Sequence, residues 1–423
     1  MTRIIEANEL NLGSLLTRRD SIVVGQACGE PTRLVEVLIA QSPEIDDLSV
    51  FIGSSFSGLI DAESARTFAL RGIGGIGTLR AASAAGRLTI IPIRMSEIEP
   101  AIAEGSLRCD VAMISVGPAD SEGFHSCGLV SDHIRAAIAK ARLVVAEINE
   151  CLPWTFGERI HSSEIDVAVP VNYSPPEIAP TRTDAVSRAI AKNCAASIDD
   201  GSVLQSGVGA LPDAIIRQLG DRKDLGVHSG MIGDGFVDLI EAGVVTNARK
   251  EIDAGISVGC ALVGTSRLYR FAHRNPAMRM APASYTHGAA VIARLTRFVA
   301  INSALEVDLT GQVNCEVIDG QYIGATGGVA DFARAASNSP GGRNIITLPA
   351  TARQGSVSRI VARLSGPVTL SRSDADVIVT EFGAAELKGC SLSERARRLV
   401  AIAHPDFRED LDRTAHAIAV RGF

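Results

Sequence analysis

Short runs of apolar and β-branched residues alternate along the chain with alanine-rich stretches that have helical spacing. Successive strand-like and helix-like segments lie at Ser21–Val24, Thr32–Ala40, Leu48–Ile52, Val111–Val116, His133–Ala141 and Leu143–Glu147. Such alternation is typical of parallel strands that are joined by crossover helices. The pattern therefore predicts an α/β fold with doubly wound parallel sheets.

A proline-rich segment interrupts this alternation near the middle of the chain. Residues 169–183 contain Pro170, Pro175, Pro176 and Pro180. Proline lacks a backbone N–H and breaks helices and central strands, so we expect neither in this segment. The sequence thus predicts an N-terminal α/β domain at residues 1–172, a linker at 173–183 and a C-terminal α/β domain at 184–423.

The two predicted domains begin in a similar way. Residues 20–31 and 200–212 each consist of a strand, a glycine-rich turn and a proline before a helix, and the second turn contains Gly207, Val208 and Gly209. Proline suits the first helical turn, and glycine lets a ligand approach the backbone amides. A duplicated unit with its site between the halves explains the likeness, but so does the general preference of α/β turns for glycine.

Composition and charge restrict the class of protein. Of the residues, 46% are hydrophobic and 21% are charged, which is enough apolar surface for a folded core. The net charge of −7 gives no global attraction for nucleic acid or anionic membranes. The N-terminal residues carry charges where a signal peptide would be apolar, and no window approaches the roughly 20 apolar residues of a membrane helix.

The cysteines and histidines show no metal or disulfide pattern. The eight cysteines form no C-x-x-C pair, which favours reduced thiols and a cytoplasmic setting. None of the eight histidines belongs to an H-E-x-x-H motif or to a close pair. We therefore expect no metal site, and the sequence singles out no histidine as catalytic.

Candidate chemistry lies in the C-terminal half. Asn302 and Glu306 fall in a segment, 298–308, that is predicted as one strand, and their even spacing places both side chains on one face. Gly327 and Gly328 form a turn that could aim amides at an oxyanion, and Glu381 follows the apolar run Val377–Thr380. The alternatives are the polar face of an edge strand, a hairpin turn and a surface carboxylate.

The chain as a whole resembles the acetyl-CoA hydrolase/CoA-transferase family. The segments that carry the resemblance are Asp110–Phe124, Gly207–Ala214, Asp224–Met231, Val244–Asn247, Gly264–Tyr269, Asn302–Gln312, Gly327–Phe332, Val379–Gly383 and Ala401–Phe407. The resemblance implies an enzyme of two similar CoA-transferase-like α/β domains. Its substrates would be an acyl-CoA and a small carboxylate, with no permanently bound cofactor, and it would be a homo-oligomer.

The resemblance also implies roles for the candidate residues. In this family a glutamate attacks the thioester carbonyl and forms an anhydride and then a glutamyl-CoA, which transfers CoA to a second carboxylate. Residues 207–209 and 327–328 would line the CoA thioester pocket. Asn302 would hold the carbonyl oxygen, and Glu381 would belong to the wall of the site.

One position departs from the family pattern. The family's nucleophilic glutamate is expected after His228 and Ser229, where this chain has Gly230. Three hypotheses remain open: a CoA-transferase that uses Glu306 as nucleophile, an acyl-CoA hydrolase with Glu306 or Glu381 as general base, and a binding protein for CoA esters. We also expect Gly230→Glu to create or raise transferase activity.

Overall fold

The computed structural model describes residues 2–179 and 183–421. The chain forms two compact units. Unit 1 comprises residues 1–179, 258–286 and 321–327, and unit 2 comprises residues 180–257, 287–320 and 328–423. Residues 180–182, which belong to the predicted linker at 173–183, lie outside the described residues, and the domain boundaries drawn from the sequence stay a prediction.

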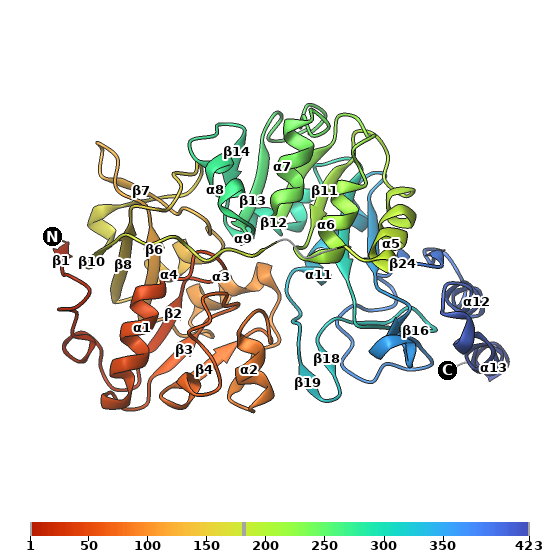
Figure 1. The fold of residues 1–423 in the computed structure, drawn as a ribbon, viewed down its shortest axis with the longest axis horizontal. Coiled ribbons are helices and arrows are strands. Elements are labelled where there is room, and N and C mark those ends of the chain that lie inside the picture. The colour runs from red at the N-terminus through yellow and green to blue at the C-terminus, as the bar shows by residue number, and fades with distance from the viewer. Residues whose placement is uncertain (1, 180–182, 422–423) are drawn as a thin grey trace. The chain divides into compact units, whose positions relative to one another are not determined.

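Unit 1 is built on an eight-stranded sheet in which all neighbouring strands are parallel (Figure 1). In spatial order the strands are β1 (Arg3–Ile4), β10 (Val167–Val171), β8 (Leu143–Asn149), β6 (Val111–Val116), β2 (Ser21–Val24), β3 (Ser49–Phe51), β4 (Ala69–Gly72) and β5 (Leu88–Ile90). The strands predicted from the sequence are confirmed. One expectation is wrong: Pro170 lies within β10, where it pairs with Ile148 of β8.

Unit 1 also contains helices and strands outside this sheet. They are α1 (Thr32–Gln41), α2 (Leu79–Ala84), α3 (Met95–Glu104), α4 (Ile134–Lys140), β7 (Phe124–Ser126), β9 (Arg159–His161), β13 (Ser257–Leu262), α8 (Ser266–Ala272), β14 (Met278–Met280), α9 (Ala283–Thr286) and β19 (Gln321–Tyr322). Residues 258–286 are tied to unit 1 by backbone bonds. The N–H of Ser131 donates to the carbonyl oxygen of Cys260 at 2.8 Å, for example.

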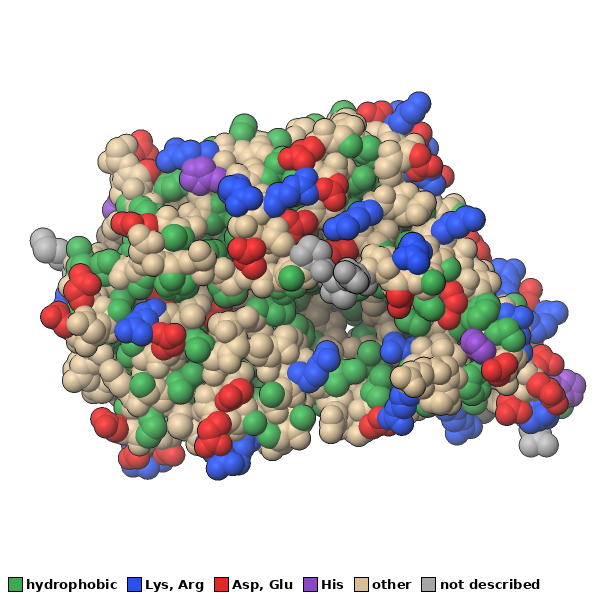
Figure 2. Space-filling model, in the orientation of Figure 1, with side chains coloured by type: hydrophobic (Ala, Val, Ile, Leu, Met, Phe, Trp, Pro, Cys, Tyr) green, Lys and Arg blue, Asp and Glu red, His purple; other side chains and the backbone are tan. Residues whose placement is uncertain are grey.

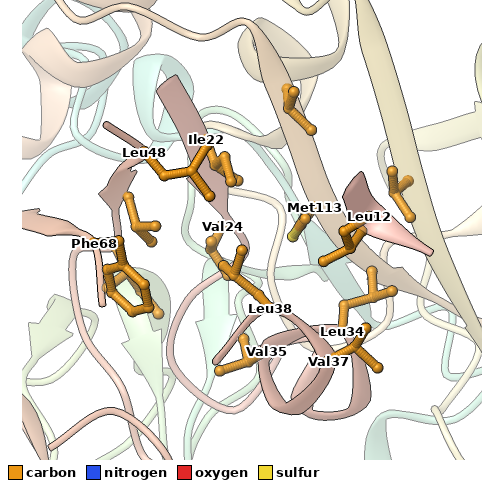
Figure 3. Packing of buried hydrophobic residues seen from close by; sticks show 14 of the residues in the cluster. Leu12, Ile22, Val24, Leu34, Val35, Val37, Leu38, Leu48, Phe68 and Met113 are labelled. Atoms are coloured by element: carbon orange, nitrogen blue, oxygen red, sulfur yellow. The ribbon is translucent and has the colours of Figure 1, made fainter. Parts of the chain in front are cut away.

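The core of unit 1 forms where α1 packs on the parallel strands. Leu34 and Leu38 of α1 lie against Val24 of β2 and Met113 of β6 (Figure 3). The spacing i, i+4 places both leucines on one face of the helix. The sequence pattern of α1 therefore fixes which face is buried.

A buried carboxyl group supports the start of α1. Glu147 of β8 is fully buried, and its Oε1 accepts a hydrogen bond from the N–H of Leu34 at 2.6 Å. Its second oxygen accepts a hydrogen bond from the hydroxyl of Tyr173. Burial raises the pKa of Glu147 from the ordinary 4.5 to about 7, although both hydrogen bonds act in the opposite direction. The carboxyl group thus ionises in the folded protein near neutral pH.

We expect Glu147→Gln to be more stable than the parent protein above pH 7. The unfolded chain loses this proton near pH 4.5 and the folded chain near pH 7, so the free energy of unfolding falls as pH rises through that window. The shift corresponds to on the order of 3 kcal/mol. Denaturant unfolding at pH 5 and pH 8 measures it, with exposed Glu104→Gln as control. Equal pH slopes for parent and variant would contradict the prediction.

Unit 2 contains a second parallel sheet (Figure 1). Its strands that belong to unit 2 follow the order β12 (Gly226–Ile232), β11 (Val203–Ser206), β15 (Phe298–Ser303), β20 (Arg343–Thr347), β24 (Val377–Thr380) and β25 (Gly383–Glu386). Of these, only β25 runs antiparallel to its neighbour among them. The helices are α5 (Ala185–Ala195), α6 (Ala210–Arg217), α7 (Asp234–Glu241), α10 (Ala289–Ile292), α11 (Val329–Asn338), α12 (Leu392–Ala401) and α13 (Pro405–Arg421).

The same strand order recurs in both units. In unit 1, β3, β2, β6, β8 and β10 are neighbours in this order, and in unit 2 the corresponding sequence is β12, β11, β15, β20 and β24. In each unit the strand of this set that comes first in the chain, β2 or β11, leads through a glycine-rich turn into a helix. The strand order and the glycine-rich turn that both units share favour a duplicated unit. A general preference of α/β turns for glycine would not explain the shared strand order.

A small sheet in unit 2 corrects one prediction from the sequence. Residues 298–308 are two strands, because β15 ends at Ser303 and β16 (Glu306–Asp308) joins a different sheet with β17 (Val313–Asn314) and β23 (Ile360–Val361). Asn302 and Glu306 therefore do not share one strand face. The remaining short strands of unit 2 are β18 (Val317–Ile318), β21 (Thr351–Ala352) and β22 (Val357–Ser358).

The surface carries both signs of charge. On the face drawn in Figure 2, basic and acidic side chains are interspersed, and neither forms a continuous patch. None of the helices in the described ranges combines the length and hydropathy needed to cross a membrane.

Candidate functional site in unit 2

Two amide side chains meet where the winding of the unit 2 sheet reverses. The chain goes from β11 to β12 on one side and later returns to β15 on the other side of β11. Ligands of open α/β sheets bind outside the carboxyl ends of the strands at such a switch point. There, Nδ2 of Asn302 donates to Oε1 of Gln205 at 3.2 Å, and Nε2 of Gln205 lies 3.4 Å from Oδ1 of Asn302. Each amide keeps a second N–H for a ligand.

The predicted glycine turn follows β11 directly. Residues 207–209 connect Ser206 with α6, and Gly209 has a φ of +122°, a conformation that favours glycine. Gly209 is the N-cap of α6, so the first amides of the helix lie next to the switch point. The turn thus supplies backbone donors at the same end of the sheet as Asn302. Its role in holding a thioester stays a prediction.

Strand β12 contains a bulge beside this turn. Leu204 pairs with Val227, but Ser206 pairs with Met231, so β12 has two more residues than β11 between these pairs. The side chain of Ser229 fills the gap in the ladder: its Oγ accepts from the N–H of Ser206 at 3.3 Å. Bulges are common next to active sites, where they re-aim a side chain. Gly230 lies in this bulge, one strand from the glycine turn.

A histidine ring occupies the space next to Gly230. A Cβ atom at Gly230 would lie 2.9 Å from Nε2 of His287, and one at Gly328 would lie 2.7 Å from Cδ2 of the same ring. Contacts under 3.0 Å are closer than real Cβ atoms approach, so either side chain would displace the imidazole. The structure thus brings Gly230 and Gly328 to one ring, whereas Gly327 belongs to unit 1.

Glu306 is held by Ser365 and by Asn314 of the paired strand β17. Its carboxylate accepts hydrogen bonds from the N–H of Ser365 at 2.9 Å, from the hydroxyl of Ser365 at 2.7 Å and from Nδ2 of Asn314 at 3.3 Å. Three hydrogen-bond donors stabilise this carboxylate and make it a weaker nucleophile. In addition, Glu306 belongs to a separate small sheet. These contacts favour a structural role for Glu306, and its predicted catalytic role remains untested.

Glu381 lies at the carboxyl end of β24, as predicted, but far from Gly230. Its Oε2 accepts a hydrogen bond from the N–H of Ala350 at 2.8 Å, which fixes the loop after β20. Four strand spacings separate β24 from β12, or about 19 Å. Glu381 therefore cannot replace a side chain at position 230.

Three residues near the predicted ones carry no signal in the sequence that marks them as part of a site. His287 and Gln205 gave no signal, because neither belongs to a motif and their neighbours are brought to them only by the fold. Arg359 is the third: its Nε is buried without a hydrogen-bond partner in the described chain, and burial lowers its pKa while Glu306 and Glu381 raise it. A cation near two carboxylates is a candidate contact for an anionic substrate.

Other features of the described residues do not compete with this site. A cavity of about 620 Å³ in unit 1, whose wall includes His125 and Glu150, contains none of the predicted site residues. In the part of the chain that the structure describes, no three His, Cys, Asp or Glu side chains are grouped to hold a metal ion.

The two α/β units and the polar site at the switch point of the unit 2 sheet define a two-unit α/β protein. Comparisons with known proteins then define its family. Residues 1–178 match the acetyl-CoA hydrolase/transferase N-terminal domain, and residues 264–415 match the C-terminal domain. The 4-hydroxybutyrate coenzyme A transferase of Clostridium kluyveri is 38% identical over 403 residues, 94% of each chain. The chain therefore belongs to the acetyl-CoA hydrolase/transferase family, and the resemblance is confirmed.

Solved structures agree over nearly the whole chain. RipA from Yersinia pestis has a TM-score of 0.93 at 34% identity, and the match covers 99% of this chain and 98% of RipA. The 4-hydroxybutyrate CoA-transferase of Porphyromonas gingivalis has a TM-score of 0.83 at 32% identity, covering 98% and 97%. The predicted α/β fold of CoA-transferase type is thus confirmed.

Proposed function

We propose that this chain acts on the CoA thioester of a small carboxylic acid and breaks the bond between the acyl carbon and sulfur. The observation that carries the proposal is the pair Gln205 and Asn302 at the switch point of the unit 2 sheet. An amide N–H can stabilise the oxyanion that forms when a thioester carbonyl is attacked. The relatives act on CoA esters, which supports the same substrate class here.

Transfer of CoA to a second carboxylate is the first candidate for the complete reaction. It is supported by relatives named as CoA transferases over 94% and 72% of this chain. Half-buried Arg359, whose charge interacts with Glu306 and Glu381, is a candidate contact for the carboxylate or for CoA. Coenzyme A is then a substrate and product rather than a bound cofactor. A homo-oligomer in the cytoplasm, with the eight cysteines as free thiols, completes the proposal.

Hydrolysis is the second candidate, and one observation favours it. Gly230 offers no side chain for a covalent intermediate. Glu381 follows β24, which lies four strand spacings, or about 19 Å, from β12. The carboxylate of Glu306 already accepts hydrogen bonds from Ser365 and Asn314. With neither Glu306 nor Glu381 available at Gly230, water is the simplest group to attack the carbonyl.

An assay of thiol release with a panel of acyl-CoAs distinguishes the candidates. Transfer requires a carboxylate acceptor and, with a covalent glutamate, shows ping-pong kinetics and inactivation by borohydride only after exposure to acyl-CoA. Hydrolysis releases CoA without an acceptor and resists borohydride. Tight binding of CoA esters without turnover across the panel would contradict the proposal and leave a binding protein.

A further inference from the structure

The cavity of about 620 Å³ in unit 1 lies where β1, β10 and β8 form one edge of the eight-stranded sheet (Figure 1). Ile4 of β1, Ala168 of β10 and Ile148 of β8 line it. Ile4 pairs with Ala168, and Ile148 pairs with Pro170, the next residue on the same face of β10. Three neighbouring strands thus present one continuous apolar floor, and the volume suits a small molecule.

Part of this apolar floor is open to solvent. Ile4 is 73% exposed, Pro170 is exposed, and Ile148 and Val171 are half-buried. Exposed apolar side chains that gather in one place mark a binding surface more often than singly scattered ones do. A ligand that covers them removes their apolar area from water, and this burial supplies the main attraction.

The wall of the cavity has an acidic side chain, Glu150, but no lysine or arginine among its lining residues in the described chain. Oε2 of Glu150 accepts a hydrogen bond from Nδ2 of Asn172 at 3.0 Å, and no ion pair joins this carboxylate to a basic side chain in the described ranges. The ring nitrogens of His125, which also lines the cavity, lie 2.7 Å from the carbonyl oxygen of Gly117 and 3.0 Å from Oγ of Ser162. Glu150 is therefore the charged group of the wall that can still take an ionic partner.

We propose that this cavity binds a small apolar molecule that carries one ammonium group. The ammonium group donates a charge-assisted hydrogen bond to the carboxylate of Glu150. The apolar body lies on Ile4, Ile148 and Ala168. Coenzyme A carries several negative phosphate charges, which an acidic wall repels. The cavity is thus a second site, separate in its residues and its ligand class from the thioester site proposed in unit 2.

The test measures displacement of the uncharged fluorescent dye Nile red from the full chain by octylamine, octanol and octanoate, each below its micelle-forming concentration. The three probes share one alkyl chain and differ in charge. We expect octylamine to bind about two- to fivefold tighter than octanol and octanoate to bind most weakly. Salt should reduce these differences. Glu150→Gln should remove the preference for the amine, whereas the matched control Glu104→Gln, an exposed carboxylate outside the cavity, should keep it.

Two further variants test the apolar floor. Ala168→Phe fills the cavity and should weaken all three probes. If it does not fold, Ile4→Asn decides, because Ile4 is 73% exposed and its replacement spares the core. Equal binding of amine and alcohol by the parent protein, or an amine preference that survives in Glu150→Gln, would overturn the proposal. So would a parent protein that binds no probe and forms a dimer that Ile4→Asn dissociates, because this face would then be an interface between two copies of the chain.

Discussion

The double variant Gly230→Glu/His287→Ala is expected to transfer CoA, whereas Gly230→Glu alone is expected to be inactive and less stable. The sequence predicts that the single substitution suffices, and the structure revises this expectation. A Cβ atom at position 230 meets Nε2 of His287 at 2.9 Å, so the single variant overpacks the site. Overpacking costs about 1–3 kcal/mol. Removal of the imidazole frees the space that a carboxylate side chain needs.

The activities of the two variants should differ in kind as well as in rate. With the new carboxylate in place and His287 absent, we expect CoA transfer about 10²-fold faster than in the single variant, with a covalent intermediate, and little hydrolysis. Initial-rate kinetics with two carboxylates, and mass spectrometry of the peptide containing position 230 after borohydride, measure this. Gly230→Ala is the control for steric cost, read as a lower Tm.

One result would contradict this prediction. If Gly230→Glu alone is as stable and as active in transfer as the double variant, His287 moves aside without cost. The ring would then not be fixed by its contacts with Phe332 and the two glycines.

The sequence predicted the elements that local pattern determines. Strands β2 and β6 lie at Ser21–Val24 and Val111–Val116, where the apolar runs placed them, because a strand buried on both faces is a short continuous apolar run. The glycine turn after β11 also lies where the sequence placed it. Turn residues carry their own conformational signal, as the φ of +122° at Gly209 shows.

The site could be predicted only in part, because its contacts join distant segments. The alternation through residues 298–308 does not reveal that the chain leaves one sheet at Ser303 and enters another at Glu306. His287 is 57 positions from Gly230, and nothing in the spacing shows that the imidazole fills the gap that the glycine leaves. The absence of a glutamate side chain at position 230 could have suggested that another bulky side chain fills the space. The sequence could not have shown which residue supplies that side chain.

Replacement of Asn302 by alanine is expected to lower kcat about 10²- to 10³-fold, the usual effect of removing one oxyanion donor. The amide of Asn302 is paired with Gln205 at 3.2 Å, so its second N–H has a fixed direction. Asn302→Asp should be slower still, because its carboxylate would face the developing negative charge and repel it. Steady-state thiol release with a saturating acyl-CoA measures both variants.

The division of the effect between kcat and KM decides what Asn302 does. A donor to the oxyanion acts in the transition state, so kcat and kcat/KM should fall together while KM changes little. A residue that only positions the substrate would raise KM with kcat preserved, and that result would contradict the oxyanion role. Asn338→Ala, at the exposed end of α11, is the matched control and should keep the parent rate. Gln205 also has an N–H that could donate to the carbonyl oxygen. If both amides face the same carbonyl oxygen, the double variant Gln205→Ala/Asn302→Ala should have a lower kcat than Asn302→Ala.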